Sequence, residues 1–370
     1  MKELIITAST YLSNLLSTYI RNSNDTIDLL VNKSIIGKDI NVDYAKIAYS
    51  GKIRQIYEAI LPIDYCYRGR QLSKWFDIKI GIKSLIYPIG QKNIFKIIQN
   101  GDYDFIYLNN LILHNLISSD YPTIIHIREL YNEKNPKVIE NIQKAYGVIF
   151  IDTYVKEPFK NISLKNSIVL NNPFDMKKSN KNINSILDLE KLQISENDTL
   201  FAVIGKIEPE KGISFIIQSF KKMNDIKSKL LIIGNGEKKY IEYCKTIAND
   251  DSRIIFIDAI EDIQIIYDCV DYVVRGEITQ SGGRTMYEGL YSGCGVIVPG
   301  NNPSEFFNYE KFKDQIHIYT PGSDIELAKQ FEKLNNTKIN EREYISNVGE
   351  YMSDFNNFIK TVLIKYYGDK

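Results

Sequence analysis

The sequence has few of the residues that build disulfide scaffolds or metal centres. Its 370 residues include four cysteines and three histidines. The four cysteines (Cys66, Cys244, Cys269 and Cys294) show neither CxxC nor metal-ligand spacing. Three of them lie in apolar or helical surroundings. This pattern predicts free thiols, a reducing compartment and no metal site.

The sequence also lacks an excess of one charge and any long apolar run. The 46 Lys and Arg residues balance the 46 Asp and Glu residues, so no general attraction to nucleic acid is expected. No stretch approaches the ~20 apolar residues of a membrane span, and the first residues do not resemble a signal peptide. Nor is there a GxxxxGK[ST] loop, a serine elbow or a His–Cys pairing. A soluble cytoplasmic protein without ATPase chemistry is expected.

The most informative segment present is a glycine-rich turn that leads into a helical pattern. Residues 280–285 (QSGGRT) place two glycines directly before a helical pattern, Arg284 to Tyr291, which contains one carboxylate, Glu288. Such a turn presents backbone N–H groups and the positive end of the helix dipole, which together bind anions. Glu288, about one helical turn further on, would lie near the group attached to that anion. A nucleoside diphosphate, with its ribose hydroxyls, fits both features.

Short β-branched runs alternate with helical patterns, which predicts parallel sheets with helices on both faces. A polar, Asn/Lys/Ser-rich stretch at 176–198 is the expected linker. Strands are expected at 4–7, 27–31, 105–108, 123–127, 148–151 and 167–170, and then at 200–204, 230–233, 254–257, 272–274, 296–298 and 317–319. The predicted α/β fold is two Rossmann-like domains, 1–175 and 199–339, facing a central cleft. Helices in 340–370 are expected to pack back toward the first domain.

Two lysines lie on the loop after the first strand of the second domain. Lys206 and Lys211 are enclosed by Gly205 and Gly212, at the end of a strand where ligands bind in doubly wound sheets. Their charges suit the two phosphates of a diphosphate leaving group, but solvated surface lysines on a turn would give the same pattern. A Gly-x-Gly turn follows the next strand; it lacks the third glycine of a dinucleotide fingerprint and is expected only to line a nucleotide.

The order of these segments resembles the retaining GT-B glycosyltransferases of the group 1, or GT4-like, family. Residues 205–212 are similar to the family's Gly-Arg/Lys-x-x-x-x-Lys-Gly loop, and 231–236 to its strand ending in Gly-x-Gly. Residues 267–271 (YDCVD) resemble Tyr-x-x-Ala-Asp, and 280–288 the Glu-x7-Glu segment. The resemblance covers 201–299 well and the first half of the chain loosely.

The resemblance implies a role for each matching residue. Lys206 and Lys211 would act in catalysis by neutralising the donor pyrophosphate, and Glu288 would hold the ribose. The implied donor-binding residues are Gly205, Gly234, Gly236, Gln280, Gly282, Gly283, Arg284, Thr285 and Glu288. Gln280 departs from the family, because a glutamate is expected there and glutamine lacks its charge. Glu277 could substitute for it or could be a solvated loop acid.

In the first half, His126 ends an apolar strand where family members often have a histidine facing the cleft. A catalytic or donor-sugar role is one interpretation, and a satisfied interior histidine is the other. The acceptor-side candidates are Thr10, Arg68, Arg70, Arg128 and Glu129. The basic and aromatic segment 52–96 suggests either peripheral contact with anionic membrane or a lipid-diphosphate-linked glycan, or an ordinary solvated surface.

The resemblance therefore implies retaining transfer of a sugar from a nucleotide donor, a UDP- or GDP-sugar, to a glycan or lipid-linked glycan in surface polysaccharide synthesis. The protein would work in the cytoplasm, including the inner face of the membrane. No cofactor or metal is expected, since the lysine loop supplies the leaving-group charge, and the bare DxD at residues 102–104 is rejected as a metal site. The alternatives are a nucleotide-sugar 2-epimerase of the same fold and a non-catalytic sugar-nucleotide-binding protein, for which Gln280 is the best argument.

Overall fold

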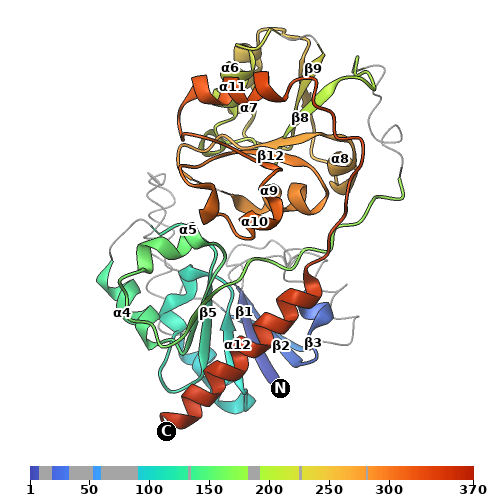
Figure 1. Ribbon diagram of the computed structural model, residues 1–370. Coiled ribbons are helices and arrows are strands. Elements are labelled where there is room, and N and C mark those ends of the chain that lie inside the picture. The colour runs from blue at the N-terminus through green and yellow to red at the C-terminus, as the bar shows by residue number, and fades with distance from the viewer. Residues whose placement is uncertain are drawn as a thin grey trace. The chain divides into compact units, whose positions relative to one another are not determined.

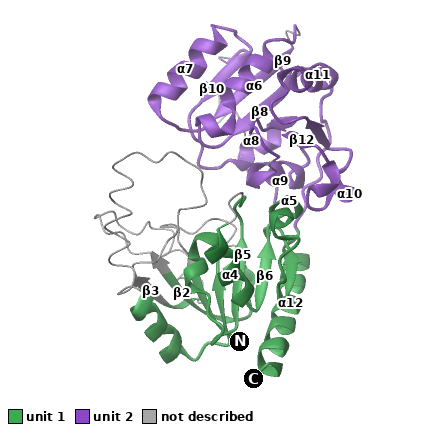
Figure 2. Cartoon of the chain, turned by 90° about the vertical axis from the view of Figure 1, so that its left-hand side faces the viewer, with its two compact units in different colours: residues 1–173, 347–370 green, residues 174–346 purple. Residues whose placement is uncertain are grey.

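The computed structural model describes residues 1–7, 19–32, 53–59, 91–131, 135–181, 192–224, 227–280 and 282–370. The chain divides into two compact units (Figures 1 and 2). Unit 1 comprises residues 1–173 and 347–370, and unit 2 comprises residues 174–346. The sequence placed a linker at 176–198, and the structure assigns that segment, where it is described, to unit 2.

Unit 1 is built on a parallel sheet with the strand order β3-β2-β1-β4-β5-β6-β7. Its strands are β1 (Lys2–Thr7), β2 (Thr26–Asn32), β3 (Ile53–Ala59), β4 (Phe105–Leu108), β5 (Thr123–Ile127), β6 (Gly147–Phe150) and β7 (Ser167–Val169). Its helices include η1 (Leu111–Leu116), α4 (Pro136–Lys144), α5 (Thr153–Lys156), η2 (Glu157–Phe159) and α12 (Val348–Gly368). The strand order reverses between β1 and β4, and ligands bind at such a switch point in open α/β sheets.

The C-terminal helix α12 belongs to the core of unit 1 (Figure 1). Its buried side chains recur every three or four residues, so they form one stripe along the helix. They pack with β-strand residues that include Ile5, Leu29 and Tyr107. The helical stripe consists of Tyr351, Met352, Phe355, Phe358, Ile359, Val362 and Tyr366. The first and last segments of the chain therefore share one core.

Glu3 is an acidic residue inside this apolar core. Its side chain is fully buried, and the Tyr19 hydroxyl donates a hydrogen bond to Oε2 at 2.8 Å. Within the described part of the chain, Oε1 has no hydrogen-bond partner. Burial raises the pKa of Glu3 from 4.5 to about 8, so the carboxyl group is protonated at neutral pH.

We expect unit 1 to lose stability as the pH rises toward the folded-state pKa of Glu3. The pKa of Glu3 is lower in the unfolded state than in the folded state. The contribution of Glu3 to the free energy of unfolding is therefore fully present below the unfolded-state pKa, and it falls by about 1.4 kcal/mol per pH unit between the two pKa values. The variant Glu3→Gln should remove this slope. Urea titrations of both proteins from acidic to alkaline pH measure it, and parallel pH profiles would contradict the assignment.

Unit 2 is built on a second parallel sheet, with the order β10-β9-β8-β11-β12-β13. Its strands are β8 (Thr199–Ile204), β9 (Ser228–Ile233), β10 (Ile254–Ile257), β11 (Tyr272–Val274), β12 (Gly295–Pro299) and β13 (Ile316–Tyr319). Its helices include η4 (Pro209–Lys211), α6 (Ile213–Phe220), α7 (Lys238–Ala248), α8 (Gln264–Cys269), α9 (Gly283–Tyr291), η5 (Pro303–Glu305), α10 (Tyr309–Phe312) and α11 (Asp324–Leu334). The strand order reverses between β8 and β11, which places the switch point beside the predicted lysine loop.

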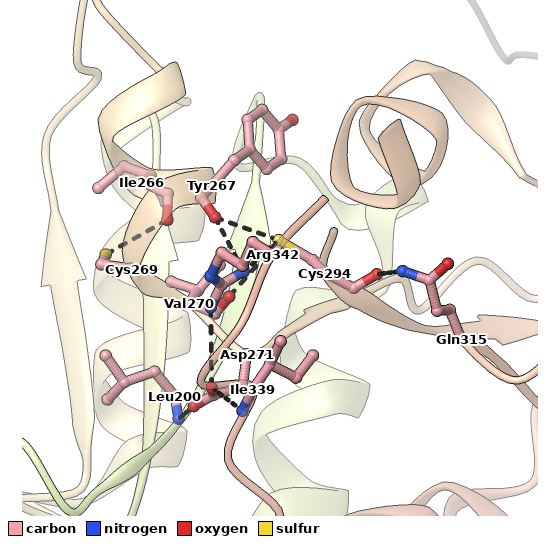
Figure 3. A network of polar contacts seen from close by, with 10 residues as sticks. All are labelled: Leu200, Ile266, Tyr267, Cys269, Val270, Asp271, Cys294, Gln315, Ile339 and Arg342. Carbon is pink, nitrogen blue, oxygen red and sulfur yellow. Dashed lines mark hydrogen bonds and ion pairs between the residues drawn. The ribbon is translucent and has the colours of Figure 1, made fainter. Parts of the chain in front are cut away.

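A buried polar network fastens the segment before α12 to the sheet of unit 2 (Figure 3). Asp271 accepts hydrogen bonds from the backbone N–H groups of Leu200 at 2.8 Å and Ile339 at 2.9 Å. Arg342 donates to the carbonyl oxygen of Tyr267 at 3.1 Å, and its guanidinium lies 3.7 Å from the Asp271 carboxylate. The network thus holds the returning chain and also fixes the backbone of Tyr267.

Candidate functional site

The loops after β8 and β9 touch at the carboxyl edge of the unit 2 sheet. A Cβ on Gly234 would lie 1.8 Å from the carbonyl oxygen of Gly205, and one on Gly236 would lie 2.0 Å from that of Ile207. Only glycine allows so close an approach without moving the backbone. These two predicted donor-binding glycines therefore have a packing role that shapes the edge on which the lysine loop lies.

A pocket at this edge brings both predicted lysines next to the segment that follows β11. Lys206 is 69% exposed, with its Nζ 2.8 Å from Glu208, and Lys211 is 40% exposed, with its Nζ 3.4 Å from Glu277. Such exposed ion pairs are worth about 0–1 kcal/mol, so an incoming pyrophosphate can displace them. The pocket is lined by Val203, Ile204, Gly205, Lys206, Lys211, Val274, Arg275, Glu277 and Thr285.

Arg275 joins this pocket to the start of α9, and sequence analysis did not identify it. Its guanidinium is 9% exposed, forms an ion pair with Glu277 and donates to Thr285 Oγ1 at 2.9 Å. A Cβ on Gly283 would lie 2.6 Å from the same guanidinium. Arg275 thus holds the first turn of α9 against the pocket. A basic residue directly after a buried strand at the switch point was the signal that could have revealed it.

The predicted anion site at the start of α9 has a simple local chemistry. The N-cap residue Gly282 has no side chain to cap the helix, and the first turn contains no acid. The backbone N–H groups and the dipole of this end thus face no competing carboxylate on their own turn. Nearby, Gln280 donates from Nε2 to Glu305 at 2.9 Å. The Gln280 amide thus occupies the position at which the family pattern would place a carboxylate.

Glu288 lies within α9 and is 7% exposed. The Tyr267 hydroxyl donates to its Oε2 at 2.9 Å, and Arg284 Nε donates to its Oε1 at 2.6 Å. Tyr267 is a further residue that the sequence did not single out for the site. Both carboxylate oxygens are thus oriented by neighbours, and the ribose-binding role of Glu288 stays a prediction.

His126 is fully buried in unit 1, at the end of β5. Its Nδ1 lies 2.6 Å from the Tyr107 hydroxyl and 3.1 Å from Arg128 Nη2. Because a guanidinium only donates, Nδ1 is assigned as the acceptor. Burial, reinforced by the charge of Arg128, lowers the pKa of His126 well below its usual value. The enclosed, neutral ring supports Arg128, and the catalytic or donor-sugar role of His126 stays a prediction.

Glu129 and Arg128, the two described acceptor-side candidates, have different surroundings. The Glu129 carboxylate accepts hydrogen bonds from Asn110 Nδ2 at 3.0 Å and from the Leu111 N–H at 3.1 Å. It therefore caps the start of η1. Arg128 is partly exposed and is supported by buried side chains at the carboxyl edge of the unit 1 sheet.

Thr10, Arg68 and Arg70 lie outside the described residues, as do Ser281 and most of the segment 52–96. Among the residues that are described, no group of three or more His, Cys, Asp and Glu side chains could hold a metal ion. In the same ranges, no helix is both long and apolar enough to cross a membrane.

Sequence comparisons match parts of the chain to known glycosyl transferases. Residues 184–351 match the family described as Glycosyl transferases group 1. A glycogen synthase of Petrotoga mobilis is 26% identical over 235 residues, 57% of this chain and 47% of the relative. An uncharacterised glycosyltransferase of Methanocaldococcus jannaschii is 28% identical over 159 residues, 42% of this chain and 37% of the relative. The chain thus spans less than half the length of these curated relatives.

Solved structures match nearly the whole chain in fold. HepE of Anabaena, in complex with UDP, gives a TM-score of 0.68 at 14% identity and covers 99% of this chain and 93% of its own. The lipopolysaccharide outer core galactosyltransferase WaaB gives 0.60 at 15% identity, with full coverage of both chains. These likenesses confirm the predicted GT-B fold of two Rossmann-like domains.

Proposed function

We propose that this chain, whose residues 184–351 belong to the group 1 glycosyl transferases, transfers a sugar from a nucleoside diphosphate donor to a glycan or lipid-linked glycan, with retention of the anomeric configuration. One observation carries the proposal. A single pocket at the switch point of the unit 2 sheet is lined by Lys206 and Lys211 and also by Thr285, which lies at the start of α9. The structures of HepE with UDP and with UDP-glucose support a nucleotide-sugar donor.

The chemistry follows from where charge develops. As the bond between the sugar and the diphosphate breaks, negative charge accumulates on the departing phosphate, and preorganised cations stabilise that transition state. Lys206 and Lys211 provide two positive charges on the pocket wall, and the N-terminus of α9 adds its dipole. The protein must also hold the acceptor hydroxyl on the face that the leaving group departs from. In this proposal the two lysines stabilise the charge of the departing diphosphate, so the reaction requires no metal ion.

Arg275 contributes to the proposed site through position more than through charge. Its guanidinium is neutralised by Glu277, and its Nη1 holds Thr285. The first turn of α9 is therefore fixed before a donor arrives, which lowers the cost of binding. Among the described residues, the pocket lining contains one carboxylate, Glu277, and no histidine, which offers less acid–base chemistry than an epimerase needs.

The proposed ribose contact predicts a selective effect of Glu288→Gln. Ribose hydroxyls that donate to a carboxylate contribute about 1.5–3 kcal/mol, so the variant should bind a nucleoside diphosphate roughly 10- to 100-fold more weakly. Inorganic pyrophosphate has no ribose, and its affinity should change little. Isothermal titration calorimetry with both ligands measures the contrast, and equal losses for both would remove Glu288 from the ribose site.

A panel of UDP-, GDP-, ADP- and dTDP-sugars tests the function itself. Acceptor-dependent release of the nucleoside diphosphate supports transfer. A rearranged sugar formed without an acceptor would instead indicate epimerisation, and binding without turnover would indicate a non-catalytic protein. Product analysis by nuclear magnetic resonance also reports the anomeric configuration.

A further inference from the structure

Among the described residues, only uncharged groups hold the guanidinium of Arg128, in unit 1. Nε donates to Asn109 Oδ1 at 3.1 Å, and Nη1 donates to Asn172 Oδ1. Nη2 lies 3.1 Å from His126 Nδ1 and 3.4 Å from the Tyr107 hydroxyl oxygen. In the described part of the chain, no carboxylate lies within ion-pair distance of this guanidinium. The described residues therefore fix the position of the Arg128 guanidinium without supplying a counter-ion.

The surrounding groups do not neutralise this charge. The carboxylate of Glu129, the next residue, is taken up at the start of η1 by Asn110 and the Leu111 N–H. His126 is neutral, because burial lowers its pKa well below the usual value. Partial burial of a guanidinium that has no counter-ion among the described residues costs free energy, so a structure that retains one requires a reason.

A buried donor without an acceptor lies in the same cluster. Asn171 is 1% exposed, and its Oδ1 accepts a hydrogen bond from the backbone N–H of Asn172 at 2.7 Å. Its Nδ2 is buried and finds no acceptor among the described residues. Asn172 itself accepts from Arg128, so the unpartnered amide and the unbalanced cation come from adjoining parts of one network. Among the described residues, the Asn171 amide lacks an oxygen acceptor and the Arg128 guanidinium lacks a negatively charged partner.

The position of the cluster suits a ligand site. It includes residues that follow the carboxyl ends of β4, β5 and β7, at the edge of the parallel sheet where ligands bind (Asn109, Arg128, Asn171 and Asn172). The side chains that support Arg128 are at most 7% exposed, whereas Arg128 itself is partly exposed. The guanidinium is thus rigidly positioned by buried groups and open on one side. Its planar fork matches phosphate and carboxylate oxygens.

We propose that Arg128 binds an oxyanion, either phosphate or carboxylate, that is part of the acceptor substrate. The identification of the ligand as the acceptor rests on the proposed function, whereas the anion site does not. Within the proposed transfer reaction, the acceptor would then be an acidic or phosphorylated glycan, and unit 1 would select it by this charge. Arg128 acts as a binding residue, and His126, Tyr107, Asn109 and Asn172 position it.

The variant Asn172→Asp tests the anion site with little change of shape. It places a carboxylate at the atom that already accepts from Arg128, so the protein supplies its own counter-ion and excludes an external anion. Binding of inorganic phosphate, measured by calorimetry at constant ionic strength in a Lys206→Ala/Lys211→Ala background, should weaken at least tenfold. Asn109→Asp provides an independent second variant and should have the same effect. The double-lysine background minimises phosphate binding at the proposed donor site.

The proposal would be overturned by the absence of phosphate binding to this parent protein at millimolar concentrations, or by equal binding to the parent and both aspartate variants. Glucuronate should bind at the same site and glucose should not, which separates charge recognition from sugar recognition; equal binding of glucose and glucuronate would also contradict it. Sugar transfer is not a readout in any of these measurements. A failure of the anion site and a failure of the proposed function therefore give different results.

Discussion

Replacing Lys206 or Lys211 with alanine is expected to lower the rate of sugar transfer about a hundredfold or more, since each would remove a preorganised charge from the departing diphosphate. The structure supports a direct role, because both lysines line the pocket and each has a single ion-pair partner among the described residues. Neither lysine is buried, so the folding of unit 2 should not change. Initial rates at saturating donor, together with the thermal midpoint of each variant, measure the two effects separately.

Lys245 provides a matched control for these variants. It lies on α7 in the same unit, is 50% exposed, and forms a comparable ion pair with Glu242 at 3.3 Å, but it does not line the pocket. Lys245→Ala should keep the wild-type rate. If Lys206→Ala and Lys211→Ala behaved like this control, the leaving group would bind elsewhere.

Replacing Gly234 with alanine is expected to destabilise unit 2 by about 3 kcal/mol or more, because the new methyl group overlaps a backbone atom and the residue has an unfavourable φ. The added Cβ would lie 1.8 Å from the carbonyl oxygen of Gly205, and the φ of Gly234 is +147°. Neither loop can give way easily, since both are anchored to adjacent buried strands. Thermal unfolding monitored by circular dichroism and scanning calorimetry measures the loss.

Gly205→Ala separates the overlap from the backbone conformation. Gly205 also has a positive φ, +131°, but an added Cβ there would meet no atom within 4 Å. It should therefore cost only the conformational strain, which is of order 1–3 kcal/mol. Equal destabilisation by the two variants would show that the close approach of the loops contributes nothing.

The sequence predicted most of the fold because apolar periodicity depends on local chemistry. The predicted strands 105–108, 123–127, 254–257 and 272–274 match β4, β5, β10 and β11 residue for residue. The strand that was missed, β3, contains Arg54, Gln55 and Glu58, which interrupt its apolar residues without regular alternation. It lies at the edge of the sheet, where polar side chains are tolerated and the apolar signal is weak.

The site was less predictable, because its contacts depend on how distant segments meet. The lysine loop and the glycine-rich turn could be recognised from spacing, and the structure brings Lys206, Lys211 and Thr285 to one pocket. The contact of Arg275 with Thr285 and that of Tyr267 with Glu288 instead depend on how α9 packs beside α8 and the end of β11. The enclosure of His126 likewise depends on its neighbours on β4, which residue spacing alone does not give.

A crystal structure of the protein with a bound nucleoside diphosphate tests the central claim most directly. We predict that the pyrophosphate oxygens lie within hydrogen-bond distance of the Lys206 and Lys211 ammonium groups and of backbone N–H groups at the start of α9. A nucleotide bound away from this pocket, with both lysine side chains left in water, would contradict the assignment.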